Sequence, residues 1–297
     1  MAQTAREIKR RMQTVQNTQQ ITKAMEMIAA AKLRKAQVRV EKSRPFRYRL
    51  DTSLNRVLSG ARKLGEPLPQ LAQVTEKKRT CLVVIGADRG LSGSYNGNVI
   101  RQAEEFLIER PDTYMILIGR RVRDHFRRSG QEFLADYVSL GDYPDIHQAH
   151  EISSLIQEFY LNGLFDHVAI LYTRFINTVN HKVTIKQILP IEEQEIEDTH
   201  ESGDELEIPL KALYLFEPSV FEVLDAMIPL YIDTIIFQSL LEAASSQQGA
   251  TMTAMSNASD NAAELLEELN LSFNRIRQGA ITTEISEIVG GAEALSE

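Results

Sequence analysis

The sequence of 297 residues contains no tryptophan, and Cys81 is its single cysteine. One cysteine cannot close a disulfide within the chain, so the composition fits a reducing compartment. No stretch reaches the ~20 consecutive apolar residues that a membrane-spanning helix needs. The charged start of the chain has no apolar segment behind it, unlike a secretory signal. We therefore expect a chain that is soluble, or that meets a membrane only through partners.

Glycine and proline are scarce at both ends of the sequence. The first ~57 residues, rich in helix-forming types, contain Pro45 and no glycine. In the segment 219–289, the only proline is Pro229 and the only glycines are Gly249 and Gly279. These two segments predict a long helix at each end, and a helix of ~55 residues would be ~80 Å long. The first segment is expected to be either one helix or a helix with a bend near Pro45, and Pro229 is expected to break or kink the start of the second helix.

The C-terminal segment repeats apolar or small residues at alternating steps of three and four, a heptad seam typical of a left-handed coiled coil. The seam consists of Met252, Met255, Ser259, Ala262, Leu266, Leu269, Phe273, Ile276 and Ala280. The N-terminal seam is weaker and is interrupted by the polar segment 16–20. Its members are Ile8, Met12, Val15, Ile21, Met25 and Ile28.

Between the two ends, the pattern of hydrophobic residues alternates between strand and helix. We predict strands at 80–85, 114–118, 167–172 and 179–189, and helices at 98–109, 120–129 and 146–161. Such alternation favours a parallel α/β sheet. The stretch 191–207 carries nine acidic residues and no Lys or Arg, and we expect a solvated loop there.

Charge is unevenly placed along the chain. The net charge is −8, which does not indicate nucleic-acid binding, yet residues 1–50 carry thirteen Lys or Arg against three acidic residues. This basic helix is either a solvated face or a surface for a partner with acidic loops.

Two motifs could carry chemistry. The glycine-rich stretch 86–97 follows a predicted strand, where dinucleotide folds hold phosphate, but it matches neither G-x-G-x-x-G nor a P-loop. A close-packed turn is the preferred interpretation, and a nucleotide site is the alternative. His147 and His150 lack the spacing and companions of a metal site, so a surface helix is expected. No catalytic, cofactor-binding or metal-ligating residue is predicted.

Three segments together resemble one family. The segments 15–37, 88–96 and 252–292 are similar to the gamma subunit of the F-type ATP synthase, in its bacterial form. Ser92 stands where this family commonly has cysteine. Plastid members carry an insert with a regulatory cysteine pair, and this chain has only Cys81, so thiol switching of that type is not expected.

The resemblance implies a fold and a domain arrangement. The fold is α/β, with a long antiparallel two-helix coiled coil formed by the terminal helices and a Rossmann-like α/β domain on its flank. The expected segments are a shaft helix at 1–60, an α/β domain at 76–215 that includes the acidic loop 191–207, and a second shaft helix at 216–297.

The resemblance also implies a role and partners. The chain would be the rotor shaft that couples ion-driven rotation of a membrane c-ring to ATP synthesis or hydrolysis at the beta subunits. Its partners would be the alpha and beta subunits, the epsilon subunit and the c-ring, at the cytoplasmic face of the cell membrane. The chemistry would belong to the beta subunits, so this chain is not expected to be an enzyme.

Seven residues are the contacts that the resemblance implies. Arg277, Gln278 and Thr282 match family positions that contact a beta-subunit loop, and Phe216 and Glu217 would lie near the foot that meets the ring. Met25 and Glu284 are the remaining expected partner contacts. A coiled-coil scaffold and a nucleotide-dependent enzyme on the α/β domain stay as alternatives, which co-purification with alpha and beta subunits would separate from the rotor.

Overall fold

The computed structural model describes residues 5–73, 79–178, 180–191 and 216–294. These residues form two compact units. One contains residues 1–31 and 251–297, and the other contains residues 32–250. Each unit therefore contains part of both terminal helices. The expected acidic loop 191–207 falls almost entirely outside the described residues.

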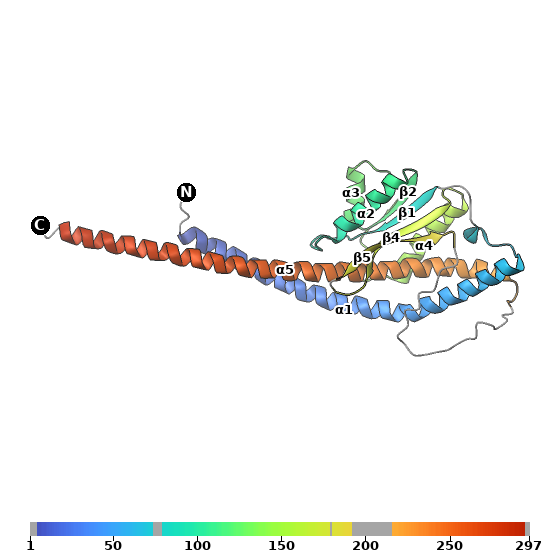
Figure 1. Ribbon diagram of the computed structural model, residues 1–297, viewed down its shortest axis with the longest axis horizontal. Coiled ribbons are helices and arrows are strands. Elements are labelled where there is room, and N and C mark those ends of the chain that lie inside the picture. The colour runs from blue at the N-terminus through green and yellow to red at the C-terminus, as the bar shows by residue number, and fades with distance from the viewer. Residues whose placement is uncertain (1–4, 74–78, 179, 192–215, 295–297) are drawn as a thin grey trace. The chain divides into compact units, whose positions relative to one another are not determined.

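The two terminal helices are each continuous. Helix α1 spans Ala5–Leu64, and helix α5 spans Val220–Ala294 (Figure 1). Both run through their internal proline, Pro45 in α1 and Pro229 in α5. Of the two effects expected of Pro229, a break or a kink, the break is therefore wrong, since α5 begins nine residues earlier and continues through it.

The heptad seam predicted on α5 is confirmed over most of its length. Its most buried members are Met255, Ser259, Ala262 and Leu269, while Leu266, Phe273 and Ile276 are half-buried. Ala280, the last expected member, is exposed. Burial at every third or fourth residue is what a helix needs in order to keep one side against a partner helix.

The seam on α1 differs from the predicted one in its second part. Ile8 is buried and Met12 and Val15 are half-buried, as expected, but Ile21 and Ile28 are exposed. Burial instead follows the heptad through the following positions: Gln19, Thr22, Glu26, Ala29, Leu33, Ala36 and Val40. Because these include polar and small residues, hydrophobicity alone indicated the wrong register.

The unit of residues 32–250 contains the sheet. Its strands are β1 (Thr80–Ile85), β2 (Thr113–Ile118), β3 (Ala135–Tyr137), β4 (His167–Phe175) and β5 (His181–Leu189). Its shorter helices are the 3₁₀ turn η1 (Gln70–Ala72), α2 (Tyr95–Glu109), α3 (Arg120–Arg128) and α4 (Ile146–Leu161). All the expected strands and helices exist, and η1 and β3 are additions that the sequence pattern did not indicate.

The strands are ordered β3-β2-β1-β4-β5. Strands β1 to β4 pair in parallel, and β5 is an antiparallel edge strand on β4. Alternate side chains point to opposite faces of a sheet, so strands such as β1, β2 and β4 contribute to two cores. The predicted α/β fold with a parallel sheet and a long helix at each end is therefore confirmed.

One core contains α2 and α3, and the other contains α4 with parts of α1 and α5 (Figure 1). On the first side, Leu82 and Val84 of β1 pack with Val99 of α2 and Phe126 of α3. On the second side, β1 contributes residues such as Val83, which join the cluster of α1, α4 and α5. The ends of α1 and α5 nearest the sheet are thus a layer of this unit.

Candidate partner-contact surface

Four of the expected contact residues lie on the last turns of α5. Arg277, Gln278, Thr282 and Glu284 are all exposed. Figure 1 shows α5 continuing past the beginning of α1, so within the described residues no other helix runs along this part of it. Met25 of α1 is half-buried, because it lies beside the seam rather than on it. Nothing in the described residues tests whether these side chains bind another protein.

Gln278 and Thr282 share one side of α5 because they are four residues apart. The Thr282 hydroxyl donates a hydrogen bond of 2.9 Å to the backbone carbonyl of Gln278. Its proton is therefore engaged within the helix, and a partner would meet it as an acceptor. Gln278 keeps both its amide donors and its acceptor available.

An apolar stripe accompanies these polar residues and was missed by the sequence analysis. Ile281, Ile285, Ile288 and Val289 are all exposed, and their spacing places them on one side of α5. By helical periodicity the stripe lies between Gln278 and Thr282 on one edge and Arg277 and Glu284 on the other. The spacing of three and four was visible in the sequence, but the expected seam ended at Ala280. An exposed apolar stripe with polar edges is typical of a protein-binding surface.

A second group of exposed apolar residues lies on α1 in the same unit. Ile21, Met27 and Ile28 are exposed, and Ile21 and Ile28 are one heptad apart on the same side. Met25 lies between this side and the seam. Lys23 and Glu26, also on α1, form an ion pair of 3.1 Å at the surface. Such a pair adds little stability, and helical periodicity turns both of its residues away from the side of Ile21 and Ile28.

The two residues expected at the foot lie in the other unit. Phe216 is half-buried and packs against the core of that unit, close to Gly60 of α1. Glu217 is exposed. Phe216 thus packs against the core directly beside the exposed Glu217. The structure places these two residues in a different unit from Met25, Arg277, Gln278, Thr282 and Glu284.

The end of the sheet where dinucleotide folds bind phosphate is occupied by protein groups. The backbone N–H of Arg120, at the start of α3, donates to the Asp88 carboxylate at 3.0 Å. A helix N-terminus attracts anions, and here a carboxylate already fills that role. The space beside it, lined partly by Leu240 and Ala243 of α5, measures only about 40 Å³. This is well below the ~300 Å³ at which small-ligand pockets begin.

The glycines nearest this loop have a packing role. A side chain at Gly86 would overlap Val122 of α3, and a side chain at Gly119 would meet the backbone of Gly86. The Asn96 side chain also stabilises the loop. It accepts a hydrogen bond from the Ala87 N–H at 3.0 Å and donates one to the Arg89 carbonyl at 3.3 Å. The preferred interpretation of a close-packed turn is confirmed.

The remaining reactive side chains are also accounted for. His150 bonds Asp233 of α5 at 2.9 Å, and His147 is exposed on the same helix, as expected for a surface helix. Over the described ranges, no three His, Cys, Asp or Glu side chains gather where they could hold a metal ion. Burial raises the pKa of the Cys81 thiol, which disfavours the reactive thiolate. Among the described helices, none is both long and apolar enough to cross a membrane.

Comparisons with known proteins agree on one family. A family model described as ATP synthase matches residues 4–295. The chain is 46% identical to the ATP synthase gamma chain of Heliobacterium modesticaldum and 43% identical to that of Moorella thermoacetica. Both comparisons cover 98% of this chain and 98% of the relative.

Solved structures give the same fold at low sequence identity. A chain of the Euglena gracilis mitochondrial ATP synthase, in a structure of OSCP, F1 and c-ring, matches with a TM-score of 0.65 and 19% identity. That match covers 98% of this chain and 94% of the other. A chain from the central stalk and c-ring of the Tetrahymena thermophila enzyme matches with a TM-score of 0.61 and 23% identity, over 80% of this chain and 99% of the other. Nearly complete coverage at more than 40% identity shows that this chain belongs to the ATP synthase gamma chain family.

Proposed function

We propose that this chain is the central rotor shaft of an ATP synthase, the role that its family membership carries. It couples rotation of a membrane c-ring to ATP synthesis or hydrolysis in the beta subunits. Alpha and beta subunits surround the shaft, while the epsilon subunit and the c-ring bind at its foot. We also keep the division into shaft helices at 1–60 and 216–297 and an α/β domain at 76–215 as part of this proposal.

The mechanism requires that each catalytic subunit meets a different side of the shaft. A binding partner shifts a conformational equilibrium only by its difference in affinity for the two conformations. A shaft whose sides were alike would favour the same conformation in every beta subunit and would transmit nothing. Rotation of an asymmetric surface presents each subunit in turn with a different contact, and nucleotide affinity follows.

The observation that carries this proposal is the uneven surface at the end of α5. One side presents the exposed Ile281, Ile285 and Ile288 with their polar edges. The opposite side, by helical periodicity, presents small and polar residues such as Gly279 and Thr283. A subunit contacting the first side would bury apolar surface, and a subunit facing the second would not. That difference is what the proposed coupling needs.

Chemistry is assigned to the partners rather than to this chain. The crevice at the ends of the parallel strands is closed by Asp88 and by α5, which supports a role without nucleotide binding. We place the chain at the cytoplasmic face of the cell membrane, held there through the c-ring. Phe216 and Glu217 are proposed as part of the foot, because Phe216 packs against the core and leaves the neighbouring Glu217 exposed to a partner.

The proposal is tested in a reconstituted complex of alpha, beta and gamma subunits. In the double variant Gln278→Ala with Thr282→Ala, we expect lower coupled turnover with unchanged nucleotide occupancy at the beta sites. A hydrogen bond to a charged group contributes about 1.5–3 kcal/mol, so losing the one from Gln278 should slow turnover roughly tenfold or more. Steady-state ATP hydrolysis and bound nucleotide are both measured.

The matched control is Thr283→Ala. Thr283 is exposed on the opposite side of α5, and its hydroxyl bonds the Gly279 carbonyl at 3.0 Å, just as Thr282 bonds Gln278. It therefore reproduces the loss of a helical threonine without touching the proposed contact. Normal turnover in the double variant, with normal assembly, would show that Gln278 and Thr282 do not carry coupling.

A further inference from the structure

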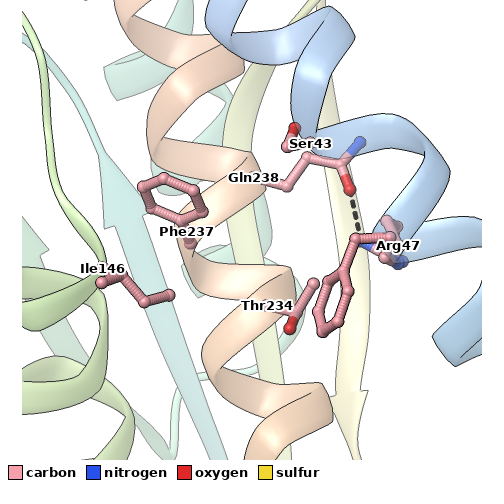
Figure 2. A pocket seen from close by; sticks show the side chains of 7 residues that line it. Ser43, Arg47, Ile146, Thr234, Phe237 and Gln238 are labelled. Atoms are coloured by element: carbon pink, nitrogen blue, oxygen red, sulfur yellow. Dashed lines mark hydrogen bonds between the residues drawn. The ribbon is translucent and has the colours of Figure 1, made fainter.

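An apolar groove lies between α1, α5 and the beginning of α4, within the unit of residues 32–250. Figure 2 shows Ile146 and Phe237 directed into the space between α4 and α5, with Arg47 of α1 bonded to Gln238 beside them. Phe46 and Thr234 complete the main lining. The groove has a volume of about 240 Å³.

Large apolar side chains in this groove remain open to solvent. Phe46 is 54% exposed and Ile146 is 46% exposed, although both lie beside the core of the unit. Phe237 is half-buried and packs against that core. Single exposed apolar side chains are common on protein surfaces, but here three gather around one hollow.

The polar groups in the groove are already satisfied. The Arg47 guanidinium bonds the Asp51 carboxylate at 2.7 Å through Nε and the Gln238 side-chain oxygen at 2.9 Å through its terminal nitrogen. Its charge is thus paired, and its position is held by both α1 and α5. A ligand entering the groove would find apolar contacts rather than free hydrogen-bonding groups.

The size of the groove favours a protein side chain over a small molecule. Small-molecule sites usually measure roughly 300–1,000 Å³ and enclose most of the ligand. This groove is smaller and lies open at the surface of three helices. One large apolar side chain would fill it while the rest of its segment stays outside, which is how anchor residues bind at protein interfaces.

One edge of the groove is strongly basic. Lys42 and Arg49 lie four residues before and three residues after Phe46, so they flank it on the same side of α1. Both are exposed, and neither makes an ion pair within the described part of the chain. Lys35 and Arg39 extend the same side by two turns, with Arg39 over the Tyr143 ring at 4.8 Å. A partner with acidic groups would therefore complement this edge.

We propose that the groove docks a segment of a neighbouring subunit, which inserts one large apolar side chain beside Phe46, Ile146 and Phe237. That segment carries carboxylates next to its apolar anchor, and these face Lys42 and Arg49. The inference rests on the proposed function, because a rotor shaft is held in an assembly of other subunits. The carboxylates steer association and select the partner, while the buried anchor holds it.

The test places a photoactivated cross-linking residue, p-benzoylphenylalanine, at Ile146 in the assembled ATP synthase. Mass spectrometry of the products identifies the peptide that is linked. We expect a peptide of another subunit in which a large apolar residue lies within a few positions of two or more acidic residues. A link to a second copy of this chain, a link to its own acidic stretch 191–207, or no link at all would overturn the proposal.

Charge reversal tests the basic edge in the same assembly. We expect Lys42→Glu with Arg49→Glu to lower the yield of this cross-link at least fivefold, and raised salt to lower it in the unmodified chain. The matched control is Arg34→Glu, an exposed basic residue of α1 that lies eight positions, or about 12 Å along the helix axis, before Lys42. An equal effect of the control and the double variant would contradict the proposed edge.

Failure of the groove proposal can be distinguished from failure of the proposed rotor role. An assembly that forms and hydrolyses ATP with normal coupling but gives no cross-link overturns only the groove proposal. Failure of the unmodified chain to co-purify with alpha and beta subunits overturns the rotor role and, with it, the docking partner.

Discussion

Lys186 of β5 lies largely buried among charges that come from α1, α5 and β4. Burial, together with the nearby Arg47 and Arg174 guanidinium groups, lowers the pKa of Lys186 to about 8, although Asp51 and Glu242 act in the opposite direction. Glu242 is buried as well, and its burial raises its pKa. Its side chain accepts a 3.1 Å hydrogen bond from Gln238. Buried charges of this kind cost folding free energy unless every group is paired.

We predict that Lys186→Met stabilises the folded chain by about 1–3 kcal/mol at pH 7, because the variant removes the cost of burying the charge. The folded pKa lies below the ordinary value of 10.5, so the unfolded chain binds more protons between the two values. Stability of the unmodified chain should therefore rise as the pH increases from 7 to 10. This gain in stability is lost again as the pH falls through about 8.

Urea unfolding of the full chain at pH 7 and pH 9.5 measures both effects. Lys182→Met, at an exposed position of the same strand, is the control and should leave the pH dependence as it is. The same increase of stability with pH in Lys186→Met as in the unmodified chain would show that Lys186 is not the responsible group.

At the scale of elements, the seam of α5 separates buried from exposed side chains of the same type. Leu269 of α5 is 7% exposed, whereas Leu271, two residues later on the same helix, is 66% exposed. A difference of two residues turns a side chain to nearly the opposite side of a helix. The pair therefore allows the same substitution to be made on and off the seam.

We predict that Leu269→Asp destabilises the unit of residues 1–31 and 251–297 far more than Leu271→Asp does. Truncating a buried leucine costs about 2–5 kcal/mol, and an unpaired carboxylate on the seam adds a desolvation cost. The exposed substitution should change stability by less than about 0.5 kcal/mol. Thermal unfolding of the full chain, followed by helix content, compares the two variants. Similar losses of helix content would mean that the seam does not hold these helices.

At the scale of the whole molecule, the α/β unit has the strand order and glycine-rich loop of a nucleotide-binding fold without an open site. We predict that the isolated chain binds neither ATP nor NAD with micromolar affinity, because Asp88 occupies the α3 N-terminus and would repel phosphate. Titration calorimetry with each nucleotide checks this, with a reconstituted alpha–beta–gamma complex as the positive control for ATP. A micromolar site in the isolated chain would contradict the prediction.

Much of the fold could be predicted from local pattern. Helix α4 begins and ends where the sequence analysis expected, because its apolar periodicity is regular and Asp145 caps it with Gln148 in a reciprocal pair. Strand β3 was missed, since three half-buried residues carry no period that can be recognised. The register of α1 was misread at Ile21 and Ile28 because the strongest apolar residues there are not the ones that face α5.

The candidate contact surface was predicted in part. Its polar members came from family resemblance, and their exposure on α5 agrees with a contact role without testing it. The accompanying stripe of Ile281, Ile285 and Ile288 needed the structure, because apolar residues at helical spacing ordinarily predict burial. Only the absence of a partner helix along this end of α5 leaves them exposed.

The sequence by itself determined the two long helices, the parallel sheet between them and the family, since these depend on composition, periodicity and long motifs. Tertiary structure decided which side of each helix is buried and what closes the crevice of the sheet. Gly249 illustrates the difference: within a helix it is locally unfavourable, and a side chain there would collide with His181 of β5. Such a requirement arises only when residues far apart in the chain are brought into contact, and a single sequence does not show which residues those are.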